Sequence, residues 1–351
     1  MSEPTPHDPK SLVGQIIGQY RIVAFLGAGG MAEVYVGEHT DPELGRRVAI
    51  KALLPEYCRR PAIVDRFMNE ARALGRIRHP GVVDIYEVDQ LPDGRVCLVM
   101  ELLRGETLAA HVARRGRLPP AEAAAIAIQI ASAMHAAHSE RIIHRDLKPD
   151  NVFVQSEADG LHVRVLDFGV AKLLDGAGPV YTATKTTLGT AVYMAPEQFR
   201  SSRDVDARAD VYALGCVLFE MLTAQPPYPA RTVVEQMRSH AFDPVPSAAQ
   251  IAGVPAALDG VLTRMLAKSR DDRYGSMVEV IEALSAAVGA ASGFDADGAT
   301  EVSDPPEMEA TRGESAQVTA ATPRGGGSSW WPLIVVLIAV GAAVAGALAL
   351  R

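Results

Sequence analysis

The 351-residue sequence has only three cysteines, Cys58, Cys97 and Cys216. An odd number without metal-ligand spacing excludes a disulfide framework and indicates a reducing compartment, and the apolar runs around Cys97 and Cys216 predict packed core thiols. Positive charge is not in excess, because 34 basic residues stand against 42 acidic ones for a net charge of -8. This balance excludes nucleic acid as an expected partner. The first dozen residues lack the apolar core of a signal peptide, so residues 1–19 are expected to be a short lead.

One ten-residue stretch concentrates the groups that phosphoryl transfer needs. Residues 142–151 read Ile-Ile-His-Arg-Asp-Leu-Lys-Pro-Asp-Asn. The stretch resembles the catalytic loop of the eukaryotic-type (Hanks-type) protein kinases. The resemblance implies that Asp146 accepts or orients the proton of the substrate hydroxyl, that Asn151 holds a magnesium ion and that Lys148 reaches the γ-phosphate of ATP. A chance polar turn is the alternative, and the offsets of Lys148 and Asn151 from Asp146 argue against it.

A glycine-rich turn lies near the start of the chain. A strand pattern begins at Tyr20, and residues 27–35 then read Gly-Ala-Gly-Gly-Met-Ala-Glu-Val-Tyr, leading into a second strand. The second strand favours a kinase nucleotide loop over a dinucleotide-binding fold, because a dinucleotide-binding fold would have a helix after the glycines. A plain hairpin turn is a further alternative. Glycine lets the backbone approach the phosphates closely. The family most often has a third glycine where this chain has Ala32, which predicts a slightly stiffer loop.

A lysine ends the next apolar strand, Arg-Val-Ala-Ile-Lys at residues 47–51. The strand resembles the third strand of the kinase small lobe, so Lys51 would bind the α- and β-phosphates; a solvated strand lysine is the alternative. Residues 66–74 have helical periodicity and contain Glu70, which the resemblance, not the periodicity, assigns as the ion-pair partner of Lys51. Pro80 is expected to stop this helix, and the next strand is expected at about residues 82–88.

A second acidic site follows the catalytic stretch. Residues 163–169 read Val-Arg-Val-Leu-Asp-Phe-Gly, an alternating strand that ends in a glycine turn. Asp167, sixteen positions past Asn151, resembles the metal-binding aspartate of the kinase Asp-Phe-Gly motif. Magnesium takes carboxylate and amide oxygens and keeps some water, so Asp167 and Asn151 would suffice as protein ligands for Mg²⁺ or Mn²⁺.

The resemblance assigns further residues to the nucleotide. The run Val-Met-Glu-Leu-Leu at residues 99–103 looks like the hinge between the lobes, where backbone groups would meet the adenine edge. The cofactor-binding residues that the resemblance implies are Leu26, Gly27, Ala28, Gly29, Gly30, Val34, Ala49, Lys51, Glu101 and Leu103. The catalytic ones are Asp146, Lys148, Lys51 and Glu70.

Residues 170–197 have the length and polarity of a kinase activation loop and close with Ala-Pro-Glu. The resemblance implies that Thr190 bonds the catalytic loop, which favours Ser/Thr over Tyr specificity. Arg145 could pair with a phosphothreonine and order the loop, and the pattern of bacterial relatives favours Thr184 and Thr182. Outside the chemistry, Asp210 fits the aspartate that braces the catalytic loop, and Arg273 fits the structural partner of Glu197.

The sequence therefore predicts an α+β, two-lobed protein-kinase fold. A small antiparallel lobe with one main helix precedes a larger, mainly helical lobe, in which residues 120–138 are expected to form a long amphipathic helix opened by Pro119 and Pro120. Residues 290–329 carry few large apolar groups and cannot form a core. The predicted segments are a lead at 1–19, the small lobe at 20–103, the large lobe at 104–289, a disordered linker at 290–329 and a transmembrane helix at 330–351.

The transmembrane prediction rests on residues 332–350, nineteen positions without a charge that follow Trp330 and Trp331. Their helical length of roughly 28 Å matches the hydrocarbon core of a bilayer, and paired tryptophans suit its interface. A buried core helix is the alternative. Small residues at Gly341 and Ala345 permit two such helices to pair, but an anchor without pairing is favoured, because glycine and alanine are frequent in membrane helices.

The chain is thus identified by resemblance as a bacterial Ser/Thr protein kinase that uses ATP and is anchored in the inner membrane, with its kinase domain in the cytoplasm. Its expected partners are protein substrates, a second copy of itself in trans and the lipid bilayer. Two other functions compete with this interpretation. A catalytically dead pseudokinase scaffold would usually lack one of Lys51, Asp146, Asn151 and Asp167, and a small-molecule phosphotransferase should lack the Ala-Pro-Glu close.

Overall fold

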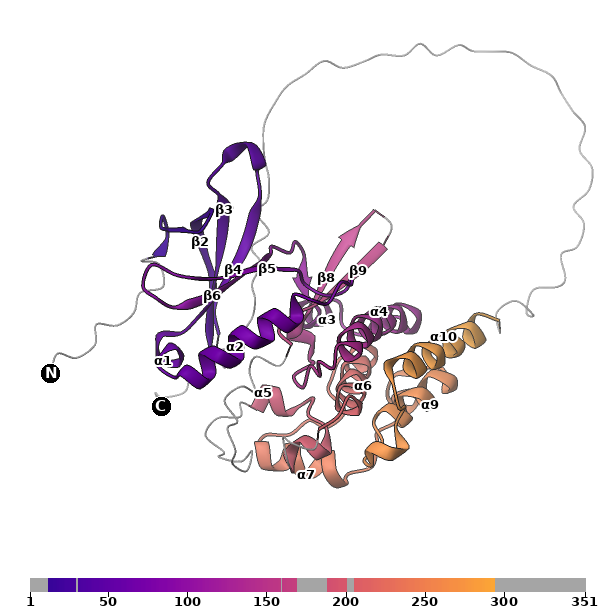
Figure 1. Ribbon diagram of the computed structural model, residues 1–351. Coiled ribbons are helices and arrows are strands. Elements are labelled where there is room, and N and C mark those ends of the chain that lie inside the picture. Colours follow the sequence, from indigo (N-terminus) through magenta and orange to yellow (C-terminus); the bar gives the residue numbers. More distant parts are fainter. Residues whose placement is uncertain (1–11, 30, 159, 169–187, 201–204, 294–351) are drawn as a thin grey trace, which may run out of the picture.

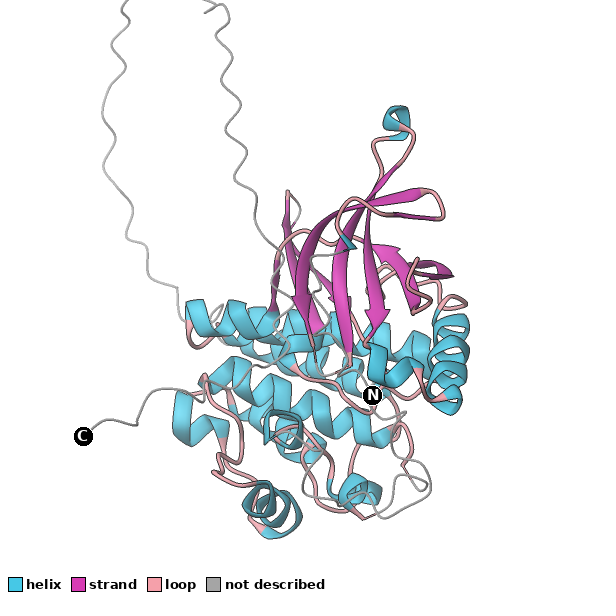
Figure 2. Cartoon of the chain, turned by 90° about the vertical axis from the view of Figure 1, so that its left-hand side faces the viewer, coloured by secondary structure: helices cyan, strands magenta, loops and turns pink. Residues whose placement is uncertain are grey.

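The computed structural model describes residues 12–29, 31–158, 160–168, 188–200 and 205–293. These residues form two lobes, one built on an antiparallel sheet and a larger one of helices (Figure 1). Turned by 90°, the strands stand above the helices of the large lobe (Figure 2). The predicted two-lobed α+β fold is confirmed. The predicted membrane segment, 330–351, lies outside the described residues, and no helix within them is long and apolar enough to cross a membrane.

Six described strands of the small lobe pair in the order β1-β2-β3-β4-β6-β5, each antiparallel to its neighbour. Gly29 N donates to Ala32 O at 2.7 Å, where the chain turns from β2 into β3. The predicted strand-glycine-strand hairpin is confirmed. The strands and helices of this lobe are β1 Ile16–Ile17, β2 Tyr20–Ala28, β3 Ala32–His39, η2 Pro42–Leu44, β4 Arg47–Leu53, α1 Pro55–Cys58, α2 Pro61–Leu74, β5 Ile85–Gln90 and β6 Val96–Glu101.

The large lobe begins with a short sheet, β7-β8-β9, and continues as helices. The predicted helix that starts at Pro120 is confirmed as α4. The elements are β7 Glu106–Thr107, α3 Leu108–Arg115, α4 Pro120–Ser139, η3 Pro149–Asn151, β8 Val152–Glu157, β9 Gly160–Val165, α5 Leu188–Ala191, η5 Pro196–Phe199, α6 Arg208–Thr223, α7 Val233–Phe242, α8 Ala248–Ala252, α9 Ala256–Met265, η6 Arg270–Asp272 and α10 Met277–Gly293.

Helices α4 and α6 form the centre of the large lobe. Alanine fills much of the buried face of α4, and α6 is buried along nearly its whole length. Gly215 of α6 leaves room for α9 and the residue after it, because a Cβ there would lie 3.0 Å from Met265 and 3.1 Å from Leu266. Close approach of this kind makes a rigid base for the loops that leave these helices.

The two lobes join at a glycine. Gly105, between β6 and β7, has a φ of +132°, and a Cβ on it would collide with the carbonyl oxygen of Val154. Only glycine combines this backbone conformation with this approach at low cost. The connection between the lobes is therefore fixed by β8 of the large lobe.

Three predicted element boundaries are wrong. The strand expected over residues 82–88 begins only at Ile85, because Val82 instead pairs with Val165 of β9. Helix α2 begins earlier than predicted, at Pro61, and it ends at Leu74, well before the proline that was expected to stop it. The strand expected to deliver Asp167 stops at Val165, because Asp167 has a left-handed backbone with a φ of 54°.

The three cysteines are free thiols. Cys97 and Cys216 are fully buried, as the apolar runs around them predicted, and Cys58 is half-buried. Burial raises the pKa of the Cys97 thiol to about 12 and raises that of Cys216 as well. The two buried thiols are therefore inert core side chains.

Candidate active site

The catalytic loop runs from the end of α4 to β8, and its chemical groups converge on Asp146. Lys148 Nζ donates to Asp146 Oδ2 at 3.1 Å, and Asn151 Nδ2 donates to the same oxygen at 3.2 Å. Asn151 Nδ2 also donates to the backbone oxygen of Asp146 at 2.8 Å. These donors hold the carboxylate in one orientation while it stays 9% exposed. The structure thus brings together three of the side chains that the sequence assigned to catalysis and metal binding.

A buried aspartate from α6 braces this loop. Asp210 Oδ2 accepts from His144 N at 2.9 Å, and its Oδ1 accepts from Arg145 N at 2.8 Å. His138 Nε2 lies 2.8 Å from Oδ2. Burial alone would raise the pKa of Asp210, but the hydrogen bond and charge of His138 outweigh it, so the pKa is lowered. The predicted bracing role of Asp210 is confirmed.

His144 links the catalytic loop to Asp167. Its Nε2 lies 2.9 Å from Leu166 O, and its Nδ1 accepts from Asp146 N at 3.3 Å, so the two bonds together assign the proton to Nε2. The ring also packs against Phe168, with centroids 4.7 Å apart. Sequence reasoning named no role for His144. Its position two residues before Asp146 was the available signal, but only the fold shows that Leu166 is its acceptor.

A cation from one lobe meets an anion from the other. Lys51 Nζ, from β4, lies 2.5 Å from Asp167 Oδ1, which follows β9. Burial works to raise the pKa of Asp167, but the charge and hydrogen bond of Lys51 outweigh it, and the pKa is lowered. Asp167 is therefore an ionised carboxylate at neutral pH. The predicted partner of Lys51, Glu70, lies on α2, but its side chain is outside the described part of the structure, so that pairing stays a prediction.

The residues assigned to ATP lie along the small-lobe sheet and at its edge. Val34 pairs with Lys51 across β3 and β4, and Ala49 pairs with Met100 across β4 and β6. Glu101 ends β6, and Leu103 packs with Val83, Phe153 and Leu166. Leu26, Gly27 and Ala28 end β2, and Gly29 follows them. Gly30 is outside the described residues. A nucleotide role for all ten stays a prediction.

The fold holds the two assigned metal ligands, Asn151 and Asp167, near each other. Leu166, the residue before Asp167, donates its N–H to Asn151 O at 2.8 Å. The described residues contain no group of three or more His, Cys, Asp or Glu side chains placed to hold a metal ion. A metal bound here would take one carboxylate and one amide from the protein, and its remaining ligands would come from phosphate and water.

The regulatory residues are only partly described. Arg145 has a left-handed backbone with a φ of 63°, and its carbonyl accepts from Gln198 Nε2 at 2.9 Å. Thr182, Thr184 and the side chain of Thr190 lie outside the described part of the chain. Gln198, which sequence reasoning missed, also accepts from Ala195 N at 2.9 Å. It thereby ties the end of the activation segment to the catalytic loop.

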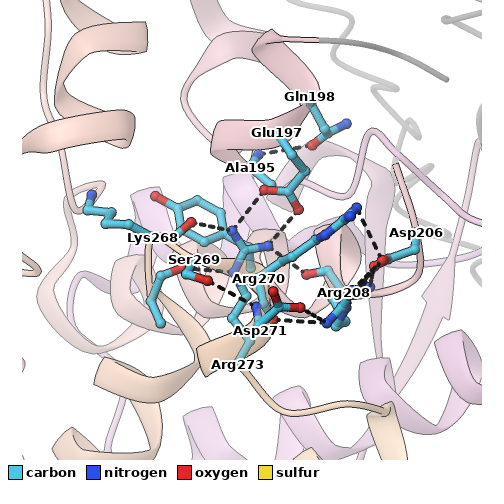
Figure 3. A network of polar contacts seen from close by, with 12 residues as sticks. Ala195, Glu197, Gln198, Asp206, Arg208, Lys268, Ser269, Arg270, Asp271 and Arg273 are labelled. Carbon is cyan, nitrogen blue, oxygen red and sulfur yellow. Dashed lines mark hydrogen bonds and ion pairs between the residues drawn. The ribbon is translucent and has the colours of Figure 1, made fainter. Parts of the chain in front are cut away.

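The Ala-Pro-Glu close is anchored by the predicted ion pair (Figure 3). Arg273 Nη1 and Nη2 donate to the Glu197 carboxylate at 2.7 and 2.9 Å, in a bidentate pair. The guanidinium is fully buried and also donates to the carbonyls of Ala267, Lys268 and Arg208. The structural role predicted for Arg273 is confirmed.

Comparison with known proteins agrees with this geometry. The protein kinase domain family model matches residues 20–284. The chain is similar to the serine/threonine-protein kinase Pkn1 of Myxococcus xanthus, with 42% identity over 79% of this chain and 39% of that protein. It is also similar to the serine/threonine-protein kinase PknH of Mycobacterium bovis, with 40% identity over 89% of this chain and 50% of that protein.

Among solved structures, the kinase domain of Mycobacterium tuberculosis PknI has a TM-score of 0.61 at 30% identity, covering 79% of this chain and 98% of that one. The chain spans half or less of the length of the two curated relatives. The family model nevertheless covers most of the sequence and both lobes. The chain therefore belongs to the protein kinase domain family, and its two lobes are a serine/threonine protein kinase domain.

Proposed function

We propose that this chain transfers the γ-phosphate of ATP to serine and threonine hydroxyls of protein substrates, with Mg²⁺ or Mn²⁺ as the metal. The observation that carries the proposal is the contact between Lys51 and Asp167, which spans the lobes and lies next to the Asp146 loop. A cation for phosphate, an ionised carboxylate for metal and a second, oriented carboxylate for the acceptor hydroxyl are the parts that phosphoryl transfer requires.

The residues present fit a metal-bound nucleotide. Asp167 is ionised and, through Leu166, stays next to Asn151, so the carboxylate and amide oxygens would hold one divalent ion. When bound, a divalent ion would supply neutralisation of phosphate charge during transfer. Lys51 pairs with Asp167 in this structure, and its ammonium would bind the α- and β-phosphates of the nucleotide.

Asp146 would position the acceptor. Its Oδ2 is occupied by Lys148 and Asn151, which fixes the plane of the carboxylate and directs the other oxygen, Oδ1, toward a substrate hydroxyl. Lys148 would follow the transferred phosphoryl group as negative charge develops. Bracing by Asp210 and His144 keeps this arrangement from relaxing between turnovers.

The wider organisation is also proposed. Residues 20–289 would be the kinase domain, 290–329 a linker and 330–351 a single helix in the bacterial inner membrane, with the kinase in the cytoplasm. The membrane would bring two copies together, so that one phosphorylates Thr182 or Thr184 of the other, and Arg145 would pair with the new phosphate. Sequence composition supports these statements.

Phosphate transfer to protein by the full chain tests the proposal. Wild type should incorporate phosphate into serine or threonine with ATP and Mg²⁺, and Lys51→Met, Asp146→Asn and Asp167→Asn should each lower the rate by at least about 100-fold. Arg47→Gln is the matched control, because its ion pair with Glu38 at 3.1 Å is exposed. Full transfer by Asp146→Asn would overturn the role assigned to that carboxylate.

A further inference from the structure

A buried ion pair lies at the root of the glycine-rich hairpin. Glu33 of β3 is 2% exposed and Arg95, in the turn before β6, is 3% exposed. Arg95 Nη1 donates to Glu33 Oε2 at 2.7 Å. The two residues are 62 positions apart, and no sequence pattern connects them.

The pair belongs to a network that joins three parts of the sheet. Tyr35 OH donates to Glu33 Oε2 at 2.7 Å. Arg95 Nε donates to Asp93 Oδ2 at 2.8 Å, and its Nη1 also reaches the carbonyl of Leu53 at 3.4 Å. The network therefore ties β3 to the end of β4 and to the turn between β5 and β6.

The strand register places this network on the face of the sheet opposite to the proposed nucleotide site. Glu33 pairs with Ala28 on one side and with Ala52 on the other, while the next residue, Val34, pairs with Lys51. Because neighbouring side chains in a strand point to opposite faces, Glu33 and Tyr35 lie on the face away from Val34 and Lys51. Tyr35 is indeed packed in the core of that far face.

Two backbone bonds carry the position of the network into the loop. Gly29 N donates at 2.7 Å to the carbonyl oxygen of Ala32, the residue before Glu33. Arg95 contacts the carbonyl of Leu53, and the next residue, Leu54, donates its N–H to Met31 O at 2.9 Å. The hairpin is thus held from both sides by the segments that the ion pair joins.

Charge is a costly way to hold a core together. Replacing a buried ion pair by apolar residues of similar volume is often neutral or stabilising, so burial of the pair does not by itself account for stability. Hydrogen bonds to a guanidinium are directional, however, and fix the relative positions of the strands that carry them. Apolar replacements would therefore keep stability but lose the fixed relative positions of the strands.

We infer that the Glu33–Arg95 pair, with Tyr35 and Asp93, is a positioning device that sets the glycine-rich hairpin against Lys51 for nucleotide binding. The inference rests on the proposed ATP-dependent function. None of these four residues touches the reacting atoms. Loss of the pair should weaken binding of ATP and leave recognition of the protein substrate, which involves the other lobe, unchanged.

The test compares single and double variants of the full chain. Arg95→Met removes the guanidinium that pairs with the buried Glu33 carboxylate, so stability and ATP affinity should both fall. Glu33→Leu combined with Arg95→Met removes both charges and should recover most of the lost urea midpoint, the remaining loss coming from the Tyr35 hydroxyl that then lacks its acceptor. In that double variant the Kd for a fluorescent ATP analogue and the KM for ATP should remain about tenfold raised. The KM for a protein substrate should stay within about twofold of wild type.

A merely structural role predicts that stability and ATP affinity recover together in the double variant, and that result would overturn the inference. Tyr35→Phe provides a second measurement if the double variant does not fold. It removes one hydrogen bond and should raise the Kd for the analogue about threefold, whereas an unchanged Kd would also contradict the inference. Arg47→Gln, on the same strand pair but away from the loop, is the control and should bind the analogue like wild type.

Because the analogue measures binding directly, the positioning role is tested even if transfer fails. A wild-type chain that binds the analogue but phosphorylates no protein would contradict the proposed function alone. A wild-type chain with normal transfer whose variants bind the analogue normally would contradict the positioning role alone.

Discussion

Arg145 and Asp167 adopt left-handed backbone conformations, with φ values of 63° and 54°. Such a conformation costs a non-glycine residue roughly 1–2 kcal/mol, so neighbouring bonds must maintain it. Around Arg145 those bonds come from Asp210 and Gln198, which hold its N–H and its carbonyl. The side chain of Asp167 is held instead by Lys51. The strain at both residues is therefore maintained by polar contacts with other parts of the chain.

Asp210→Asn should therefore impair catalysis indirectly, through the position of the Asp146 loop. An amide can accept through only one atom, so one of the two N–H groups at His144 and Arg145 would face an NH₂ group and lose its partner. We expect a fall in kcat of at least about tenfold and a loss of about 1–3 kcal/mol in the free energy of unfolding. Enzyme assays and urea unfolding measure the two effects.

Asp243→Asn is the matched control, since its carboxylate is partly exposed and lies 3.7 Å from the exposed side chain of Arg238. It should leave kcat and the urea midpoint unchanged. An Asp210→Asn variant with wild-type kcat would show that the bracing bonds are not needed to orient the loop.

His240 should make the protein sensitive to acid. The ring is fully buried, with Nδ1 2.8 Å from Tyr212 OH and Nε2 2.7 Å from Gln236 Nε2. Burial first, and the charge of Lys268 second, lower its pKa from 6.5 to about 3. The unfolded chain thus binds a proton below pH 6.5 that the folded protein does not bind until about pH 3. Stability contributed by the neutral ring is present above pH 6.5 and is lost as the pH falls toward 3.

The expected slope from this one group is at most roughly 1.4 kcal/mol per pH unit. Urea unfolding of wild type and His240→Gln at pH 7, 6 and 5 isolates it, because all other titrating groups are shared. The variant can differ in absolute stability, but its stability should depend less on pH. Parallel curves for the two proteins would contradict the assigned pKa shift.

At the scale of elements, the activation segment is fastened at its end by a polar network, which Figure 3 shows. Arg273 binds Glu197 and also the carbonyl of Arg208, the first residue of α6. Arg208 in turn binds Asp206 and Asp271. One buried arginine thereby joins η5, the start of α6 and the turn around η6.

Arg273→Met should cost about 3–5 kcal/mol, because it leaves Glu197 without its partner in a mostly buried site. The measurement is the urea midpoint of the full chain, with Arg238→Gln as a surface control expected to change stability by less than about 0.5 kcal/mol. Glu197→Gln should cost less, since a neutral amide still accepts one of the two hydrogen bonds. Equal midpoints for Arg273→Met and wild type would contradict this reading of the network.

The sequence predicted elements best where chemistry fixes both residue type and spacing. The glycine turn between two strands, the Asp146 loop and the partner of Glu197 follow from such motifs. Boundaries failed where a tertiary contact competes with local preference, as at Val82, which pairs with the large lobe and not with its own sheet. The Glu33–Arg95 pair could not be predicted, because the sequence does not show which charged residues are buried. Only the fold places these two residues next to each other.

For the whole molecule, two of the contacts between the lobes differ in kind, because one is an ion pair and the other is the backbone junction. Lys51 and Asp167 are connected by a single ion pair that a metal-bound nucleotide would replace. Gly105, by contrast, is confined by Val154 and has a backbone that only glycine adopts easily. Relative movement of the lobes should therefore respond to the nucleotide, with the junction as its fixed point.

Placement of the whole chain depends on residues 330–351, which are proposed to cross the membrane. The linker predicted over residues 290–329 is helical as far as Gly293, where α10 ends, so its remaining residues, 294–329, would have a root-mean-square reach of roughly 33 Å as a flexible coil. Such a tether would keep the kinase within a thin layer beside the bilayer, so that copies would encounter one another at raised effective concentration even without a specific dimer. Both anchoring and encounter should disappear when the helix is removed.

A chain truncated after Ser329 should therefore be released from bacterial membranes on fractionation, and phosphorylation of residues 181–187 should fall several-fold at equal expression. Activity toward an added protein substrate should remain unchanged, because the active site lies entirely in the kinase lobes. Replacing Gly341 and Gly346 by Ile separates anchoring from helix pairing: this variant should stay in the membrane, and a drop in its loop phosphorylation would indicate that the helices pair through their small residues. A truncated chain that still sediments with membranes would contradict the anchor itself.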